Sequence, residues 1–242
     1  MIQELLRPPV VGFDGFRVPG RLGLRDGPGL LPGEESAASA MSPARRLEFT
    51  AVRGCAREGL RRLGVRPAPI LRGPAGEPLW PAGVVGSMTH CSGYHAAAVA
   101  PADEVAAVGI DAEVHAPLRY AEMLGLIATP EERARISGLT RDHPQVHWDR
   151  LAFVTKESVF KAWFALTGRP LGPGEIVVHL DPSGGHFRAR PRTAGGDAAP
   201  DVELSGRWAV RDGVLLAAVT VPRAAARRYG HRAATRAVPA SA

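Results

Sequence analysis

Residues 151–163 read LAFVTKESVFKAW, and this predicted helix sets one carboxylate on a face that is otherwise aromatic. At 100° per residue, Phe153, Phe160 and Phe164 lie within about 60° of Glu157. The acid is therefore predicted to point toward the core. An isolated buried carboxylate is costly, so we expect Glu157 to be neutral, to pair with a base or to bind a cation.

The use of lysine points to the same stretch. Of the 30 basic residues only Lys156 and Lys161 are lysines, and both lie beside Glu157. An ordinary i,i+4 surface pair between Glu157 and Lys161 is the simpler interpretation. Because the chain uses arginine at its other basic positions, lysine at these two suggests that compact ammonium groups are needed here instead of planar guanidinium groups.

Composition limits the class of protein. With 242 residues, of which 45% are hydrophobic, the chain can bury a large core as one domain or as two halves. A net charge of +6 and a pI near 10.1 favour an anionic partner: nucleic acid, a phosphorylated small molecule or an acidic protein. Cys55 and Cys91 form neither a disulfide framework nor a metal-ligand spacing, so a reducing cytoplasm is expected. No signal peptide or membrane span is predicted.

Local patterns predict both helices and strands. Ser42 and Pro43 begin a helix with an arginine-rich face, and Gly64 ends it. Strands at 84–90, 94–100 and 105–114 are joined by turn signals and are expected to form an antiparallel meander. The remaining expectations are an edge strand and loops at 1–34, helices at 115–150, strands at 175–180, 206–211 and 213–221, and turns at 183–201.

The strand VAAVGIDAEV at 105–114 carries a second chemical signal. Asp111 and Glu113 are two residues apart, so they point to the same face and repel each other unless a cation or a proton intervenes. Alone, such a pair is more typical of a solvated strand end. Together with Glu157 the two acids supply three hard oxygen ligands, which suit Mg²⁺ that also holds a substrate phosphate.

Four motifs in this order resemble a known family: GSMTHCSGYHAAAVAP at 86–101, VGIDAE at 108–113, FVTKESVFKAW at 153–163 and LTGRPLG at 166–172. The sequence is similar to the 4'-phosphopantetheinyl transferases, within the surfactin-type group and its branch like enterobactin synthetase component D. The resemblance covers roughly residues 42–222. It implies an α+β fold of two similar halves related by a pseudo-twofold axis, with the active site in the cleft between them.

The halves implied are 1–104 and 105–223, followed by a flexible tail at 224–242. The resemblance also implies the reaction, in which a serine of an apo acyl or peptidyl carrier protein attacks the β-phosphate of coenzyme A. The serine receives the 4'-phosphopantetheine arm, and 3',5'-ADP leaves. The implied partners are coenzyme A, Mg²⁺ and the carrier protein, with a cytoplasmic monomer that binds neither nucleic acid nor membrane.

Site residues follow from the resemblance position by position. Asp111, Glu113 and Glu157 match the metal-binding acids, and Glu157 is also the candidate base. Lys161 matches a lysine facing the pyrophosphate, Asp111 also matches a coenzyme A contact, and Lys156 matches another. The other matches on the coenzyme A side are Thr89 and His90 at the phosphates, Arg45 and Arg53 around the 3'-phosphate, and Arg72, Gly76, Glu77 and Pro78 near the adenine.

The sequence departs from the family at two positions. Related proteins of the surfactin branch often carry a lysine at the position of Glu77 and a tryptophan near Phe153. Two other classes of function are also compatible with parts of the sequence: a Mg²⁺-dependent phosphohydrolase or nuclease, and a non-catalytic basic protein that binds nucleic acid. The first would place acid and lysine two apart on a strand, and the second gives no use for three acids.

Overall fold

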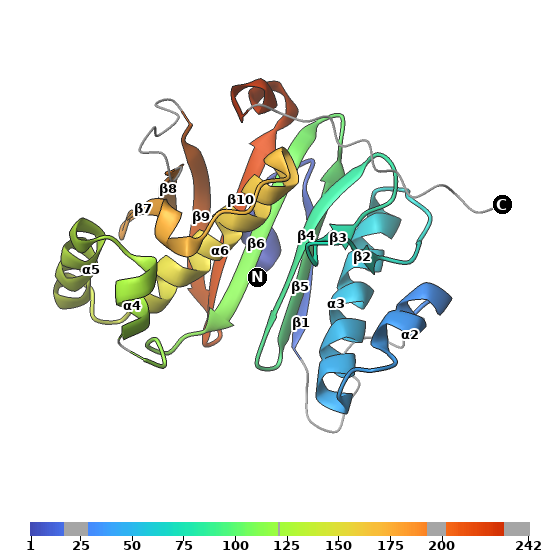
Figure 1. The fold of residues 1–242 in the computed structure, drawn as a ribbon, viewed down its shortest axis with the longest axis horizontal. Coiled ribbons are helices and arrows are strands. Elements are labelled where there is room, and N and C mark those ends of the chain that lie inside the picture. The colour runs from blue at the N-terminus through green and yellow to red at the C-terminus, as the bar shows by residue number, and fades with distance from the viewer. Residues whose placement is uncertain (17–28, 121, 193–201, 230–242) are drawn as a thin grey trace.

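A computed structural model describes residues 1–16, 29–120, 122–192 and 202–229, and it shows a mixed α+β protein (Figure 1). The predicted fold class is confirmed. The helices are α1 (Ile2–Leu5), α2 (Pro32–Ala38), α3 (Pro43–Arg62), α4 (Glu122–Ile127), α5 (Pro130–Asp142) and α6 (Trp148–Thr167), with 3₁₀ turns η1 (Pro173–Glu175) and η2 (Arg223–Tyr229). The strands are β1 (Val11–Phe16), β2 (Leu71–Arg72), β3 (Pro78–Leu79), β4 (Val84–Cys91), β5 (Tyr94–Pro101), β6 (Val105–Val114), β7 (Ile176–Leu180), β8 (His186–Pro191), β9 (Leu204–Arg211) and β10 (Val214–Pro222).

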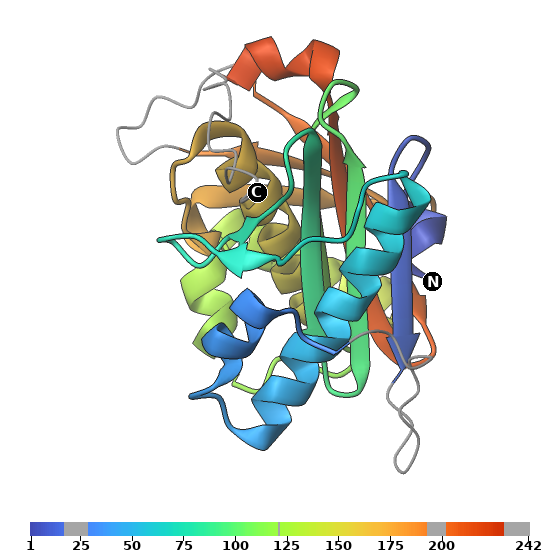
Figure 2. The same ribbon diagram turned by 90° about the vertical axis from the view of Figure 1, so that its right-hand side faces the viewer.

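Two antiparallel sheets carry one long helix each. The first sheet has the order β1-β5-β4 and is crossed by α3 (Figure 2); the second has the order β6-β10-β9-β8-β7 and supports α6. Helix α3 begins as predicted, because the Ser42 hydroxyl accepts a bond from the Arg45 amide and Pro43 occupies the first turn. Gly64 follows the helix with a φ of 72°, a conformation that favours glycine.

The expected three-stranded meander is wrong at its third strand. Strands β4 and β5 pair, but β6 pairs with β10 and opens the second sheet. Side chains join the two sheets where β4 runs beside β6: the amides of Ile110 and Ala112 donate to the hydroxyls of Ser87 and Thr89, at 3.0 and 3.1 Å. The seam is therefore built from side-chain acceptors in place of a backbone ladder.

The structure changes the expectations for the predicted turns and the predicted tail, and it also locates the predicted domain boundary. Strand β8 forms inside the stretch predicted to be turns, with residues that alternate between exposed and buried. Residues 224–229 of the predicted tail lie in η2, while 230–242, like 17–28 and 193–201, lie outside the described residues. The boundary predicted at 104/105 lies in the turn between β5 and β6. One buried cluster nevertheless includes residues of both halves, among them Ala98 and Leu216. The halves share a core.

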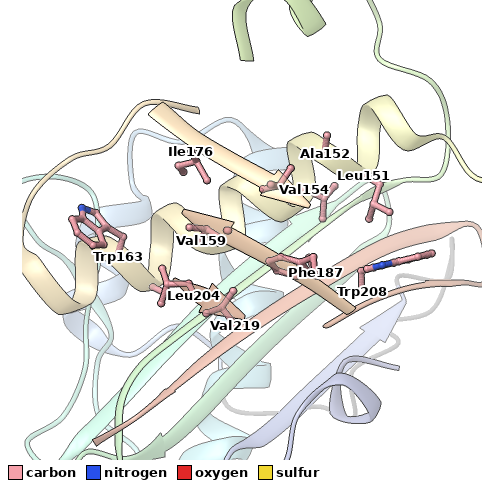
Figure 3. Packing of buried hydrophobic residues seen from close by; sticks show 14 of the residues in the cluster. Leu151, Ala152, Val154, Val159, Trp163, Ile176, Phe187, Leu204, Trp208 and Val219 are labelled. Carbon is pink, nitrogen blue, oxygen red and sulfur yellow. The ribbon is translucent and has the colours of Figure 1, made fainter. Parts of the chain in front are cut away.

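Helix α6 packs its buried side on the second sheet (Figure 3). Leu151, Val154 and Val159 are fully buried there, against Phe187 and Trp208 among others. The face that carries Glu157 was predicted to point into the core, but its side chains are only partly buried. The structure turns that face toward the junction between the sheets, where a polar site can form.

Close approach of α6 to β6 requires a glycine. A Cβ atom at Gly109 would lie 2.0 Å from the Ser158 carbonyl oxygen and 2.8 Å from the Ala162 amide nitrogen. We therefore expect Gly109→Ala to lower the free energy of unfolding by about 1–3 kcal/mol or more, because helix and strand must separate. Urea unfolding measures this loss. Gly125→Ala in α4 is the control, since nothing lies within 4 Å of its Cβ; a Gly109→Ala variant as stable as that control would contradict the packing.

Candidate active site

Lys161 joins α6 to β6 and β4. Its ammonium group lies 2.8 Å from Asp111 Oδ1 and donates to the carbonyls of Ile110 and Met88, at 3.0 and 3.3 Å. The side chain keeps 27% of its surface exposed, so it is both anchored and accessible. This arrangement brings together two residues that are 50 positions apart in the sequence, as the motifs predicted.

Thr89 supports Asp111 from the opposite strand. Its hydroxyl donates to Asp111 Oδ1 at 3.0 Å and accepts the Ala112 amide, and the residue is buried. A hydroxyl whose one hydrogen is already given to a carboxylate cannot donate it to a phosphate. The predicted phosphate contact of Thr89 is therefore corrected: in this structure Thr89 orients Asp111.

Glu113 and Glu157 lie close enough to Asp111 to be affected by its charge. Burial raises the pKa of Glu157, with Asp111 adding to the rise and Lys161 opposing it. Burial also raises the pKa of Glu113, with the same contribution from Asp111. Mutual repulsion of this kind is what a cation relieves.

The acids fit a hard metal ion by type and by electrostatics. Their oxygens do not yet converge, since no group of three His, Cys, Asp or Glu side chains is arranged to hold a metal within the described parts of the chain. Lys161 holds Asp111, and Arg150 holds Glu113. Each of these ion pairs uses one oxygen of its acid, so a bound metal would share the acids with the two bases.

His90, on β4, lies beside the basic residues of α3. Arg45 Nη1 contacts His90 Nε2 and also donates to Glu48 Oε2 at 3.2 Å. Burial lowers the pKa of His90, with Glu48 opposing and Arg45 and Lys161 adding to the decrease. A neutral imidazole that accepts from Arg45 is consistent with this direction. Arg45 and His90 thus lie together, as predicted.

Arg53 departs from the prediction because it is an interior residue. Only 3% of its surface is exposed, its Nε donates to the Ile70 carbonyl at 2.9 Å, and it lies 3.6 Å from Glu34. Glu34 is fully buried and also accepts from Arg57 at 2.7 Å. Burial lowers the pKa of Arg53 to about 10, with Glu34 opposing and Arg72, Arg57 and Arg45 adding to the decrease. Arg53 therefore supports the basic cluster from beneath, and Arg45 and Arg72 present charge at its surface.

The residues predicted near the adenine form a hairpin of β2 and β3. Arg72 pairs in register with Pro78, and Gly76 adopts a φ of 87° in the turn. The Glu77 carboxylate accepts the Ala75 amide at 2.9 Å within that turn. Glu77 thus has a role in the turn, because its charge is directed at the turn's own backbone.

Lys156 does not face this site. Its side chain is fully buried and its ammonium group lies 3.0 Å from Glu132, while donating to the carbonyls of Ile127, Pro173 and Ile176. Glu132 Oε1 also accepts a hydrogen bond from the Val178 amide, at 2.8 Å. The predicted coenzyme A contact of Lys156 is wrong in this structure, because an ammonium with no exposed surface cannot reach a ligand in solvent.

Two residues that the sequence patterns do not predict are Arg150, which holds Glu113, and Glu34, which holds the arginine cluster. Arg150 lies seven residues before Glu157 in the same helix, a spacing that returns to the same face and could have identified it. Glu34 had no comparable signal, since it contacts residues far along the chain. Among the described helices, none is both long and apolar enough to cross a membrane.

Comparison with known proteins identifies a family for this chain. The 4'-phosphopantetheinyl transferase N-terminal domain matches residues 34–100, and the 4'-phosphopantetheinyl transferase superfamily matches residues 107–210. The transferase Svp of Streptomyces mobaraensis is 47% identical over 79% of this chain and 78% of its own. The transferase PptT of Mycobacterium tuberculosis is 46% identical over 81% and 88% of the two chains, and enterobactin synthase component D of Salmonella typhi is 33% identical over 55% and 54%.

The chain belongs to the 4'-phosphopantetheinyl transferases. It is an enzyme that transfers phosphopantetheine to carrier proteins, with coenzyme A as the family's substrate. The two matched segments meet at the β4–β6 seam, where Lys161 and Thr89 both donate to Asp111 Oδ1.

Proposed function

We propose that this enzyme transfers the phosphopantetheine arm of coenzyme A to a serine of an apo acyl or peptidyl carrier protein at the β4–β6 seam. The observation that carries the proposal is the Lys161–Asp111 pair, 2.8 Å long, with the partly buried carboxylates of Glu113 and Glu157 within its electrostatic reach. Cationic donors and a carboxylate base in one site suit the transfer of a phosphorus group between oxygens.

In the proposed reaction, the serine oxygen forms a bond to the β-phosphorus of coenzyme A. The bond from that phosphorus to the oxygen bridging the two phosphates breaks, and 3',5'-ADP leaves with the electron pair. Glu157 receives the serine proton, and the Lys161 ammonium stabilises the negative charge of the departing ADP. Lys161 already has a fixed direction, because the carbonyls of Ile110 and Met88 hold its ammonium group.

Mg²⁺ is proposed as the metal, held by Asp111 and Glu157 with Glu113 beside them. When bound, it would neutralise phosphate oxygens and favour the displacement. The proposed nucleotide contacts are Arg45 and His90 toward the phosphates, and Arg72, Gly76 and Pro78 around the base. The test is to incubate the enzyme with coenzyme A, Mg²⁺ and an apo carrier protein and to measure the carrier's mass; no gain of phosphopantetheine with any acyl or peptidyl carrier would contradict the proposal.

Carrier proteins are acidic as a class, which suits an enzyme of net charge +6. Enterobactin synthase component D among the relatives suggests peptidyl carriers of siderophore or nonribosomal peptide synthesis. Cys55 and Cys91 are buried thiols, and burial raises the pKa of each to about 12, so neither suits the role of a nucleophile. A reducing cytoplasm remains our expectation. A monomeric enzyme that does not bind nucleic acid or membrane remains our expectation.

Arg45 gives a test of the nucleotide side. Its side chain is 41% exposed, on the surface above Arg53 and beside His90. Loss of a charge-assisted bond to phosphate costs about 1.5–3 kcal/mol, so we expect Arg45→Ala to raise the KM for coenzyme A roughly tenfold or more. The KM for dephospho-coenzyme A, which lacks the 3'-phosphate, is expected to change much less. Arg61→Ala on the same helix is the control, since among the described residues Arg61 is an exposed side chain paired with Glu58 alone; equal losses for both substrates would rule out 3'-phosphate binding by Arg45.

A further inference from the structure

The first turn of α6 holds the segment that follows β6. Arg150 Nη1 donates to Glu113 Oε2 at 3.2 Å, and its Nη2 donates to the Pro117 carbonyl at 2.8 Å. Its neighbour Asp149 accepts the Leu118 amide at 2.8 Å. The guanidinium of Arg150 is thus fixed at two points, and one of them is a carboxylate of the proposed metal site.

Arg150 and Lys161 occupy equivalent places on either side of Glu157. They lie seven residues before it and four after it, which puts all three on one face of α6. Each base holds one acid of β6: Lys161 holds Asp111 and Arg150 holds Glu113. The helix face and the strand face therefore meet through two ion pairs with Glu157 between them.

Packing alone gives no reason for a guanidinium at this place. Only 18% of the Arg150 side chain is exposed, and its buried Nε has no hydrogen-bond partner among the described residues. An unpaired buried donor lowers stability, whereas an apolar side chain would avoid that cost. What the planar group supplies is direction, because its bond to the Pro117 carbonyl fixes the plane of the guanidinium, from which Glu113 accepts one bond.

We propose that Arg150 is a positioning residue for the metal site, which fixes Glu113 through Oε2 so that its other oxygen is directed to the cation. The inference rests on the proposed function, since it assumes a metal among these acids. Partners that orient a metal-binding carboxylate typically change metal affinity 10- to 100-fold when removed. Loss of Arg150 has two opposite possible effects: lost orientation weakens metal binding, whereas loss of a competing positive charge alone would strengthen it.

The experiment measures Mn²⁺ binding by electron paramagnetic resonance, with coenzyme A present and no carrier protein, so that no turnover occurs. We expect Arg150→Met to weaken Mn²⁺ binding 10- to 100-fold. Arg150→Lys, which keeps the charge but loses the two-point geometry, is expected to recover only part of the loss. Asp149→Ala is the matched control, because it releases the same segment at Leu118 without touching Glu113, and its Mn²⁺ affinity is expected to stay within about twofold of wild type.

A double-mutant cycle identifies the route of the effect. In a Glu113→Gln background, Arg150→Met is expected to cause no further loss, because Arg150 acts through Glu113. Unchanged or tighter binding in Arg150→Met, full recovery by Arg150→Lys, or additive losses in the double variant would each overturn the inference while leaving the metal site standing. A wild-type enzyme that binds no Mn²⁺ would overturn the metal site and the inference together.

Discussion

Glu157→Gln is expected to slow phosphopantetheine transfer by a factor of about 10² to 10⁴, the usual contribution of a general base. The amide keeps the size of the side chain but can neither accept the serine proton nor supply a charged ligand to a metal. The rate is measured from the mass of the carrier protein at saturating coenzyme A. Activity within threefold of wild type would remove Glu157 from the role of base.

The same substitution is expected to leave the protein as stable as wild type or more stable. Burial and the charge of Asp111 raise the pKa of Glu157, so the folded state disfavours its ionised form. A raised carboxyl pKa means that stability falls as the pH rises through that pKa, and the amide removes this loss. The melting temperature of Glu157→Gln should therefore match or exceed that of wild type at pH 7, and the difference should shrink at pH 4. Glu131→Gln, at an exposed position of α5, is the control for the loss of one carboxylate.

Sequence patterns predicted elements well where a local rule determines them. The N-cap and first-turn proline of α3, the alternating strand that carries Asp111, and the helix around Glu157 all follow from residues near in sequence. Strand β8 had such a signal as well, since its residues alternate fully between exposed and buried. Its arginines and its place between glycines and prolines hid that pattern.

Pairing between distant segments could not be predicted in the same way. Periodicity says which face of a strand is apolar, but it does not say which strand lies alongside. The pairing of β6 with β10 and the hydroxyl contacts of Ser87 and Thr89 across the seam depend on the whole fold. The motif predicts a phosphate contact for Thr89, whereas in the structure its hydroxyl donates to Asp111.

The two lysines show that a motif match does not place every charged residue of the motif in the same site. Lys156 and Lys161 are five residues apart, which places them about 140° apart around a helix. They therefore cannot both face one site closely, and helical geometry alone could have separated them. In the structure Lys161 lies at the seam, and Lys156 enters the opposite, buried side of α6.

This separation predicts a loss of stability for Lys156→Met. The substitution leaves the fully buried Glu132 without its counter-charge and three carbonyls, those of Ile127, Pro173 and Ile176, without their donor. Breaking a buried ion pair from one side typically costs about 3–5 kcal/mol. We expect a decrease of that size in the free energy of unfolding, measured by urea at neutral pH, with the KM for coenzyme A unchanged in the protein that remains folded.

Lys161→Met is the matched control, because it removes the other lysine of the same helix. We expect it to lower the transfer rate and to cost less stability, since Lys161 is partly exposed and Asp111 keeps the Thr89 hydroxyl as a donor. Adding Glu132→Gln to Lys156→Met should recover part of the lost stability, as the unpaired buried charge is then gone. If Lys156→Met were instead stable and raised the KM for coenzyme A, Lys156 would reach the substrate in the working enzyme, and α6 would have to turn or shift to bring it there.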